Sequence, residues 1–285
     1  SGGNDGEKIT RRIIEGLPKH LAPGGTFICL AAATDRSSGD LEQRLREMLG
    51  QSADEFDVTV IVRSTVEPAV FAFRQLMLGT ADRDDIKAWK DVFQELGVRR
   101  VVYGPIIIQR HAAPRKPFTI RREAGPLSTP REIWWAIEWE RMQAEGGLEE
   151  KLLASRLTTL AGSRLRIDHV LDGTDDWEAR NYRLVTNHPF AMECEDNPFL
   201  ALVTSRLQKS ATGQELFDQL KRDGVLHPQT DPAEFCEALC TLIAGGFIQT
   251  DYFPLPRPAG QAPLHGIEGD DQPATGPVSS PPAAG

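Results

Sequence analysis

The sequence predicts an α/β fold, in which a layered α/β domain is followed by an α+β domain that ends in a winged-helix-like module. Three observations lead to this prediction. Helical and strand patterns alternate from residue 7 to residue 110. Four prolines then interrupt both patterns between residues 112 and 130. Near the C-terminal end, three short helical patterns precede a strand over 197–253.

The first domain, residues 1–112, is predicted to open with an amphipathic helix. Apolar residues recur at helical spacing from Ile9 to Leu21, and Asn4 with Glu7 three residues later resembles a capping box. Pro18 is expected to distort the last turn of this helix. The residues 23–25, Pro-Gly-Gly, should end it before a buried strand.

Three buried strands and three further helices complete the prediction for this domain. The strands occupy 26–30, 56–62 and 99–109. The helices begin after Asp40, at Pro68 and after Asp82 or Asp84. Three strands between helices correspond to half of a doubly wound sheet, and the glycine-rich turn that opens the other half is not found here.

The remaining chain is divided into a linker, an accessory domain and a tail. The proline-rich residues 113–130 are predicted to form an interdomain linker. Residues 131–255 should form an α+β domain, with a helix over 132–143 and a strand hairpin before the winged-helix-like segment. Residues 256–285 are rich in Pro, Gly, Ala and Ser without apolar periodicity, so we expect a disordered tail.

Composition limits the classes of protein that this chain can belong to. Its 285 residues suit about two domains, and 40% hydrophobic residues with a net charge of −9 are typical of a globular protein. No apolar stretch approaches the roughly 20 residues that span a bilayer, so no membrane association is predicted. The four cysteines form no CxxC pair, and a cytoplasmic location is expected.

Several short motifs in the first domain occur in an order that resembles a known family. They are the run from Asp5-Gly6-Glu7 to Arg11-Arg12-Ile13-Ile14, then Leu21-Ala22-Pro23-Gly24-Gly25 before a strand, Val66-Glu67-Pro68-Ala69-x-Phe71, Leu96-Gly97-Val98, and Tyr103-Gly104-Pro105. Together they resemble the second half of a class I S-adenosylmethionine-dependent methyltransferase of the bacterial small-domain type. The likeness covers roughly residues 1–112, and the accessory domain resembles the C-terminal domain of that bacterial branch.

The resemblance implies a fold and an activity. The three strands would be the last three of the methyltransferase sheet, with the final strand antiparallel between its two predecessors. The donor, S-adenosylmethionine, would be bound mainly by an N-terminal half expected upstream of Ser1, so the chain alone should be inactive. The acceptor would be a nitrogen of a protein, a nucleic acid or a small molecule. Neither the acceptor nor the oligomeric state follows from the sequence.

Three polar residues are candidates for lining the substrate pocket. Asn4, Asp5 and Asp35 lie where open α/β sheets bind ligands, at the carboxyl ends of parallel strands. Methyl transfer to nitrogen needs alignment of the reactants more than strong acid or base groups, so no catalytic residue is assigned. The alternative interpretation, helix capping by Asn4 and Asp5 and a turn at Asp35, is favoured.

A basic cluster suggests a second function from another class. Arg115, Lys116, Arg121 and Arg122 could follow a phosphate backbone, although a solvated linker is the favoured interpretation at a net charge of −9. The alternative function is therefore a non-catalytic regulatory module that binds protein or nucleic acid, with nucleic acid left open but not favoured. Cys236 and Cys240 lie four residues apart on an apolar helix and are interpreted as core residues, so no metal is predicted.

Overall fold

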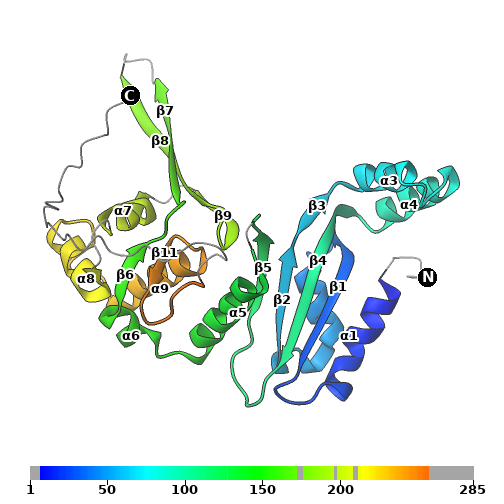
Figure 1. Cartoon of the computed structure of the whole chain (residues 1–285), viewed down its shortest axis with the longest axis horizontal. Coiled ribbons are helices and arrows are strands. Elements are labelled where there is room, and N and C mark those ends of the chain that lie inside the picture. The colour runs from blue at the N-terminus through cyan, green and yellow to red at the C-terminus, as the bar shows by residue number, and fades with distance from the viewer. Residues whose placement is uncertain (1–6, 127, 172–175, 196–197, 208–210, 257–285) are drawn as a thin grey trace, which may run out of the picture.

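The computed structural model describes residues 7–126, 128–171, 176–195, 198–207 and 211–256. Its fold is α/β, with a mixed and mostly antiparallel open sheet flanked by helices (Figure 1). Among the described residues, this sheet has eight strands in the order β1-β4-β2-β5-β9-β8-β7, with β3 paired to β4 outside that path. We refer to residues 7–126 as the N-terminal lobe and to 128–256 as the C-terminal lobe.

The N-terminal lobe alternates helices and strands as predicted. Its elements are α1 (Lys8–His20), β1 (Thr26–Arg36), α2 (Leu41–Leu49), the 3-10 helix η1 (Gly50–Glu55), β2 (Phe56–Val62), β3 (Ser64–Val66), α3 (Pro68–Met77), α4 (Arg83–Glu95), β4 (Val98–Arg110) and β5 (Thr119–Ala124). Side chains of α1 and α2 pack with β1, β2 and β4 into one core, which includes the fully buried Ile14, Leu45 and Phe56. β2 is buried along its whole length, which agrees with a sequence that is apolar apart from Asp57 and Thr59.

The start of α1 differs from the prediction. The helix begins at Lys8, so Glu7 occupies the N-cap, and its side chain makes no capping bond. The predicted capping box with Asn4 is therefore wrong. Pro18 lies inside the helix, which continues to His20. The buried carboxylate of Glu7 binds β1 instead of the helix, as described below.

The predicted order of the three long strands is confirmed. β4 lies between β1 and β2 and is antiparallel to both, so β1 and β2 run parallel to each other. Gly104 in β4 allows the close approach of β2, because a Cβ at this position would lie 1.9 Å from the carbonyl oxygen of Ile61. A glycine is therefore required at this position of β4, where the backbone of β2 approaches closely.

The prediction of an irregular linker over 113–130 is wrong in its central part. β5 pairs parallel to β2, and its C-terminal end pairs antiparallel to β9. Local sequence did not reveal this strand, because prolines precede it and Arg121 and Arg122 interrupt its apolar pattern. Both arginines are neutralised by carboxylates far along the chain, so β5 depends on tertiary contacts.

The C-terminal lobe contains the predicted helices and several strands. Its elements are α5 (Pro130–Glu145), α6 (Leu148–Ala154), β6 (Arg156–Thr159), β7 (Arg164–Leu171), β8 (Trp177–Thr186), β9 (Phe190–Glu195), α7 (Pro198–Arg206), β10 (Ala211–Thr212), α8 (Gly213–Arg222), α9 (Pro232–Ala244) and β11 (Ile248–Thr250). Its core centres on α9 and on the stacked rings of Trp135, Trp139 and Phe253. The sequence did not predict α6, β6 or β9.

The segment expected to resemble a winged helix contains α7, α8, α9 and β11 in the predicted order. β6 lies between β10 and β11 in a small antiparallel sheet. Thr212 caps α8 and Asp231 caps α9, as their sequence positions indicate. The predicted hairpin is formed by β7 and β8, which project away from the helices of this lobe (Figure 1). The tail beyond Pro256 lies outside the described residues.

Candidate functional site

The carboxyl ends of β1 and β2 form the edge of the sheet where ligands bind in open α/β folds. At this edge the N-terminus of α1 meets the end of β1. The linking side chain is Glu7, whose carboxylate accepts hydrogen bonds from the hydroxyl of Thr34 at 3.0 Å and from its backbone N–H at 3.3 Å. The N-terminus of α1 is therefore fixed beside the last residues of β1.

Two arginines complete a buried ion cluster around Glu7. The guanidinium of Arg36 lies 3.0 Å from the Glu7 carboxylate, and that of Arg44 in α2 also donates to it. All three side chains are at most 8% exposed. In a medium of low dielectric such a cluster fixes the relative positions of α1, β1 and α2. We refer to Glu7, Thr34, Arg36 and Arg44 as the Glu7 cluster. No sequence motif predicted it.

Asp35, the described member of the predicted pocket residues, is held by protein contacts. Its carboxylate accepts hydrogen bonds from Arg121 at 2.8 and 2.9 Å and from the backbone N–H of Leu41 at 3.1 Å. Burial raises the pKa of Asp35, but the bonds from Arg121 and Leu41 and the charges of Arg121 and Arg99 outweigh it, so the pKa lies below its ordinary value. The carboxylate thus joins β1 to β5 and to the start of α2.

The other two predicted pocket residues, Asn4 and Asp5, lie outside the described residues. Asp35 lies at the carboxyl end of β1, as predicted, and its role in lining a substrate pocket stays a prediction. The sequence did not indicate that Asp35 would be paired, because Arg121 is 86 residues away along the chain.

The basic candidates are mostly engaged in ion pairs. Arg115 binds both carboxylate oxygens of Asp57, and Arg121 binds Asp35 and Glu42. Arg122 binds Glu140 at 2.8 Å. Lys116 is exposed. Because these three arginines already have carboxylate partners, they do not form the array of free cations that follows a phosphate backbone.

Asp57 is the centre of a second buried cluster, which also lacked a sequence motif. Besides Arg115, it binds the ring Nε2 of His111 at 2.9 Å and the backbone N–H of Phe118 at 3.1 Å. The sequence feature that could have indicated this cluster is Asp57 itself, a charged residue inside the apolar run of β2. The cluster anchors the chain as it leaves β4 and enters β5, so its role is structural.

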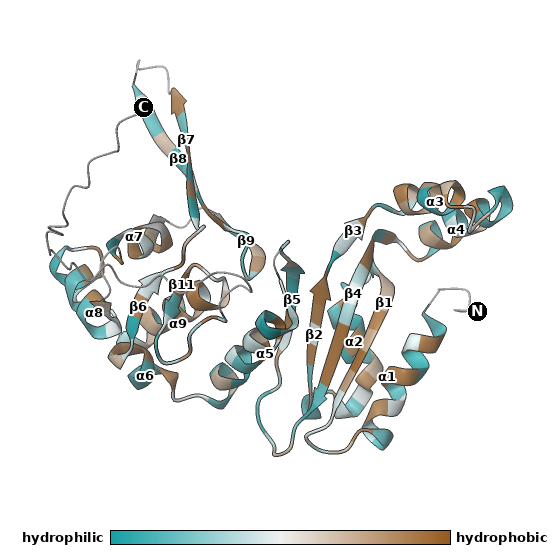
Figure 2. Cartoon of the chain, viewed as in Figure 1, coloured by the Kyte–Doolittle hydropathy of each residue, from teal (hydrophilic) through white to brown (hydrophobic). Residues whose placement is uncertain are grey.

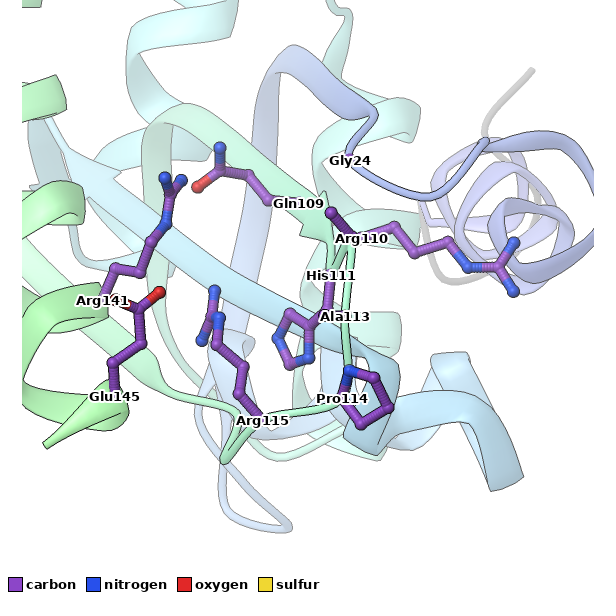
Figure 3. Close-up of a pocket in the computed structure, with 10 residues that line it drawn as sticks. Gly24, Gln109, Arg110, His111, Ala113, Pro114, Arg115, Arg141 and Glu145 are labelled. Atoms are coloured by element: carbon purple, nitrogen blue, oxygen red, sulfur yellow. The ribbon is translucent and has the colours of Figure 1, made fainter.

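A cavity of about 520 Å³ lies at the opposite end of the sheet from the Glu7 cluster. The side chains of Gln109, Arg115, Arg141 and Glu145 surround its opening, whereas the side chain of Arg110 points away (Figure 3). Arg115 is bound to Asp57, and Arg141 pairs with Glu138 at 3.1 Å. The lining residues include no nucleophile held by a general base, so the cavity is not assigned as a catalytic site.

The cysteines behave as core residues. Burial raises the pKa of Cys236 to about 11 and that of Cys240 to about 12, with smaller contributions from nearby acidic groups. Thiols of this kind stay protonated near neutral pH and are poor metal ligands. Within the described parts of the chain, no group of three or more His, Cys, Asp or Glu side chains could hold a metal ion.

An apolar surface lies next to the carboxyl edge. β1 is the outermost strand of the sheet, and Ile28 and Leu30 are 56% and 60% exposed. The register places Leu30 opposite Pro105 and Ala32 opposite the exposed Tyr103, so these side chains share one face of the sheet. Figure 2 shows that β1 is apolar over much of its length. We refer to Ile28, Leu30, Ala32 and Tyr103 as the β1 face. No helix of the described residues covers it.

Comparisons with known proteins found no family model and no curated protein that matches this chain. In the part of the chain that the structure describes, no helix is long and apolar enough to cross a bilayer.

Proposed function

We propose that this chain forms the trailing strands and the accessory domain of an S-adenosylmethionine-dependent methyltransferase that acts on a nitrogen atom. The donor would be held mainly by a preceding half of the sheet, upstream of Ser1. The observation that carries the proposal is the arrangement of the three long strands: β4 antiparallel between parallel β1 and β2, with an open β1 edge beside them. This order agrees with the resemblance in the sequence motifs.

The β1 face supports the same proposal. The edge strand β1 has 11 residues, exposed Ile28 and Leu30, and neither Lys nor Pro. Its register shift and its charged residues lie at the C-terminal end, so most of the strand lacks the features that protect edge strands from pairing. An edge of this kind is suited to another strand. The strand that would continue the sheet is the one we assign to the donor-binding half, with further helices over the β1 face.

Within this proposal, the Glu7 cluster fixes the N-terminus of α1 beside the carboxyl edge. S-adenosylmethionine, when bound, would supply a methyl group on a cationic sulfur to the acceptor nitrogen. Alignment and exclusion of water contribute most of the acceleration. Glu7 would hold the start of α1 at the carboxyl edge, while Asp35 would hold β5 and α2 behind it.

Calorimetry with S-adenosylmethionine tests the proposal. Two proteins are compared, the 285-residue chain and the same chain extended by the residues encoded directly upstream of Ser1. The extended protein should bind the donor and transfer its methyl group to nitrogen acceptors, and the 285-residue chain should do neither. Equal binding by both proteins, or binding by neither, would refute the proposed division of the sheet.

A second candidate function, a non-catalytic module that binds another protein, is favoured by one observation. The C-terminal lobe presents a projecting hairpin with exposed apolar side chains. This candidate predicts that the extended protein binds no donor. Binding of nucleic acid is less favoured than binding of protein, because Arg115, Arg121 and Arg122 already form ion pairs with carboxylates.

A further inference from the structure

The hairpin of β7 and β8, which we refer to as the arm, is amphipathic along its whole length. Alternate residues of a strand point to opposite faces, and directly paired residues share a face. The register of β7 and β8 therefore gives one face that is apolar apart from a single histidine. Its members are Leu165, Ile167, His169, Leu171, Trp177, Ala179, Tyr182 and Leu184.

Most of this face is open to solvent. Leu171 is 49% exposed and Trp177 is 67% exposed, whereas Leu184 at the base of the arm is buried. Two-stranded hairpins are only marginally stable in water without an apolar face packed against something. An exposed apolar surface on such an element is a sign of an interface.

A β-bulge gives the arm its continuous apolar face. Ile167 pairs with Tyr182 and Asp168 pairs with Arg180, so Asn181 is an extra residue in β8. Asn181 has a φ of 53°, a conformation that asparagine adopts more readily than most residues. If Asn181 instead paired regularly with Asp168, Arg180 would lie opposite His169 on the apolar face, in place of Ala179. The bulge therefore places Ala179 and Trp177 on the same face as Tyr182.

The charged side chains of the arm occupy the opposite face. Arg180 pairs with Glu178 at 2.6 Å, and Arg183 pairs with Asp168 at 3.3 Å. Arg164 and Arg166 alternate with the apolar residues of β7 and therefore share this face. Among the described residues of the arm, His169 and Tyr182 are the titratable side chains on the apolar face.

We infer that the apolar faces of two arms pack against each other, so that a second copy of this chain covers the arm. A twofold contact brings the same patch together from both copies. Because the arginines and carboxylates lie on the outer faces of such a pair, no like charges meet in the contact. The two ribbons would pack as a small two-layer β structure with sheets about 10 Å apart.

The size of the arm sets the strength expected of this contact. Eight residues of β7 at about 3.3 Å each give a ribbon roughly 26 Å long. With a width of about 10 Å for two strands, the two copies together cover roughly 500 Å² of footprint. Stable dimers bury about 1,200 Å² or more. We therefore expect a weak dimer with a dissociation constant in the micromolar range or above.

α3 also has exposed apolar side chains, so a contact between the arm of one copy and α3 of another is the alternative to a contact between two arms. Phe73 and Met77 are 61% and 70% exposed. A contact between the arm of one copy and α3 of the next joins two different patches, so it forms chains unless the geometry closes into a ring. A contact between two arms uses the same patch on both copies, so association ends at a dimer. The largest species formed in solution therefore distinguishes the two arrangements.

Sedimentation velocity of the 285-residue chain from about 5 to 300 µM tests the inference. The weight-average sedimentation coefficient should rise toward that of a dimer and no further. Trp177→Ser and Leu171→Ser should each weaken association at least tenfold, with unchanged circular dichroism. Phe73→Ser, which removes an equally exposed ring from α3, should leave association unchanged. A monomer at every concentration, growth beyond a dimer, or an effect of Phe73→Ser would each overturn the inference.

Disulfide trapping provides a matched pair of variants. Ala179→Cys places a thiol on the apolar face, and Glu178→Cys places one on the charged face of the same strand. Under mild oxidation, the first variant should form a link between residues 179 of two copies, identified by mass spectrometry, and the second should not form a comparable link. Equal trapping of both variants, or trapping of Glu178→Cys alone, would contradict the proposed contact.

Discussion

At the scale of single residues, the carboxyl edge of the sheet is organised by buried charges. In the Glu7 cluster, one carboxylate accepts hydrogen bonds from Thr34 and Arg44 and forms an ion pair with Arg36, and all four residues are at most 8% exposed. Removing one partner of a buried ion pair is strongly destabilising, because the buried charge of the other loses that compensation. The stability of the N-terminal lobe should therefore depend on Glu7 far more than on neighbouring surface acids.

Replacing Glu7 by alanine should lower the free energy of unfolding by about 3 to 5 kcal/mol, because Arg36 and Arg44 would lose their carboxylate partner. Urea unfolding followed by circular dichroism measures the change. The control is Glu15→Ala on the exposed side of α1, which should alter stability by less than about 0.5 kcal/mol. Equal effects of the two substitutions would show that the cluster does not stabilise the fold.

Asp35 should make the stability of the protein depend on pH in the acid range. Its pKa is lower in the folded state than in the unfolded chain, so its stabilising contribution is complete above the unfolded pKa of about 3.9. This contribution disappears as the pH falls through the folded pKa. We expect Asp35→Asn to be less stable than the original chain at pH 6, with a difference that shrinks below about pH 4.

Thermal unfolding at a series of pH values from 6 to 3 measures this difference. Asp91→Asn, an exposed position on α4, serves as the control and should show no such convergence. If the difference in melting temperature between the original chain and Asp35→Asn stays constant down to pH 3, the ion pair with Arg121 is not the source of that difference.

At the scale of elements, sequence patterns predicted those whose own residues have a clear helical or strand periodicity. α3, which begins at Pro68, α4, which begins at Arg83, α5 and β2 carry such patterns. β5 was missed because its arginines are neutralised by Asp35 and Glu140, at positions that local sequence cannot relate to it. Asp35 lies at the carboxyl end of β1, as predicted, but its pairing with Arg121 depends on the same long-range contact.

The bulge in β8 is an element whose role can be tested directly. Asn181→Val should destabilise the arm by about 1 to 2 kcal/mol, because a β-branched residue does not tolerate the positive φ. Hydrogen exchange of the β7 and β8 amides should become faster. Asn181→Gly, which fits the same backbone conformation, should keep the exchange slow. Faster exchange in both variants would indicate that the asparagine side chain, and not the backbone conformation, maintains the arm.

At the scale of the whole molecule, a single sheet connects the two lobes. β5 joins β2 of the N-terminal lobe to β9 of the C-terminal lobe, and ion pairs of Arg121 and Arg122 lie on either side of that junction. Among the described residues, no strand pairs with the outer edges of β1 and β7. We assign the edge of β1 to the donor-binding half, and the apolar face of the arm, at the other end of the sheet, to a neighbouring copy.

Charged substitutions on the β1 face should separate folding from assembly. Because Ile28 and Leu30 are more than half exposed, lysine at either position should change the stability of the 285-residue chain by less than about 1 kcal/mol. In the protein extended upstream, the same substitutions should weaken binding of S-adenosylmethionine at least tenfold, measured by calorimetry. Leu171→Lys on the arm is the control, and it should leave donor binding unchanged.

Hydrogen exchange of the β1 backbone tests most directly whether this strand is an interior strand of a larger methyltransferase sheet. Alternate amides of β1 point away from β4 and should exchange rapidly in the 285-residue chain. In the protein extended upstream of Ser1, the same amides should become strongly protected. If they exchange at equal rates in both proteins while the extended protein is folded, β1 is a true outer strand and the proposed methyltransferase sheet does not exist.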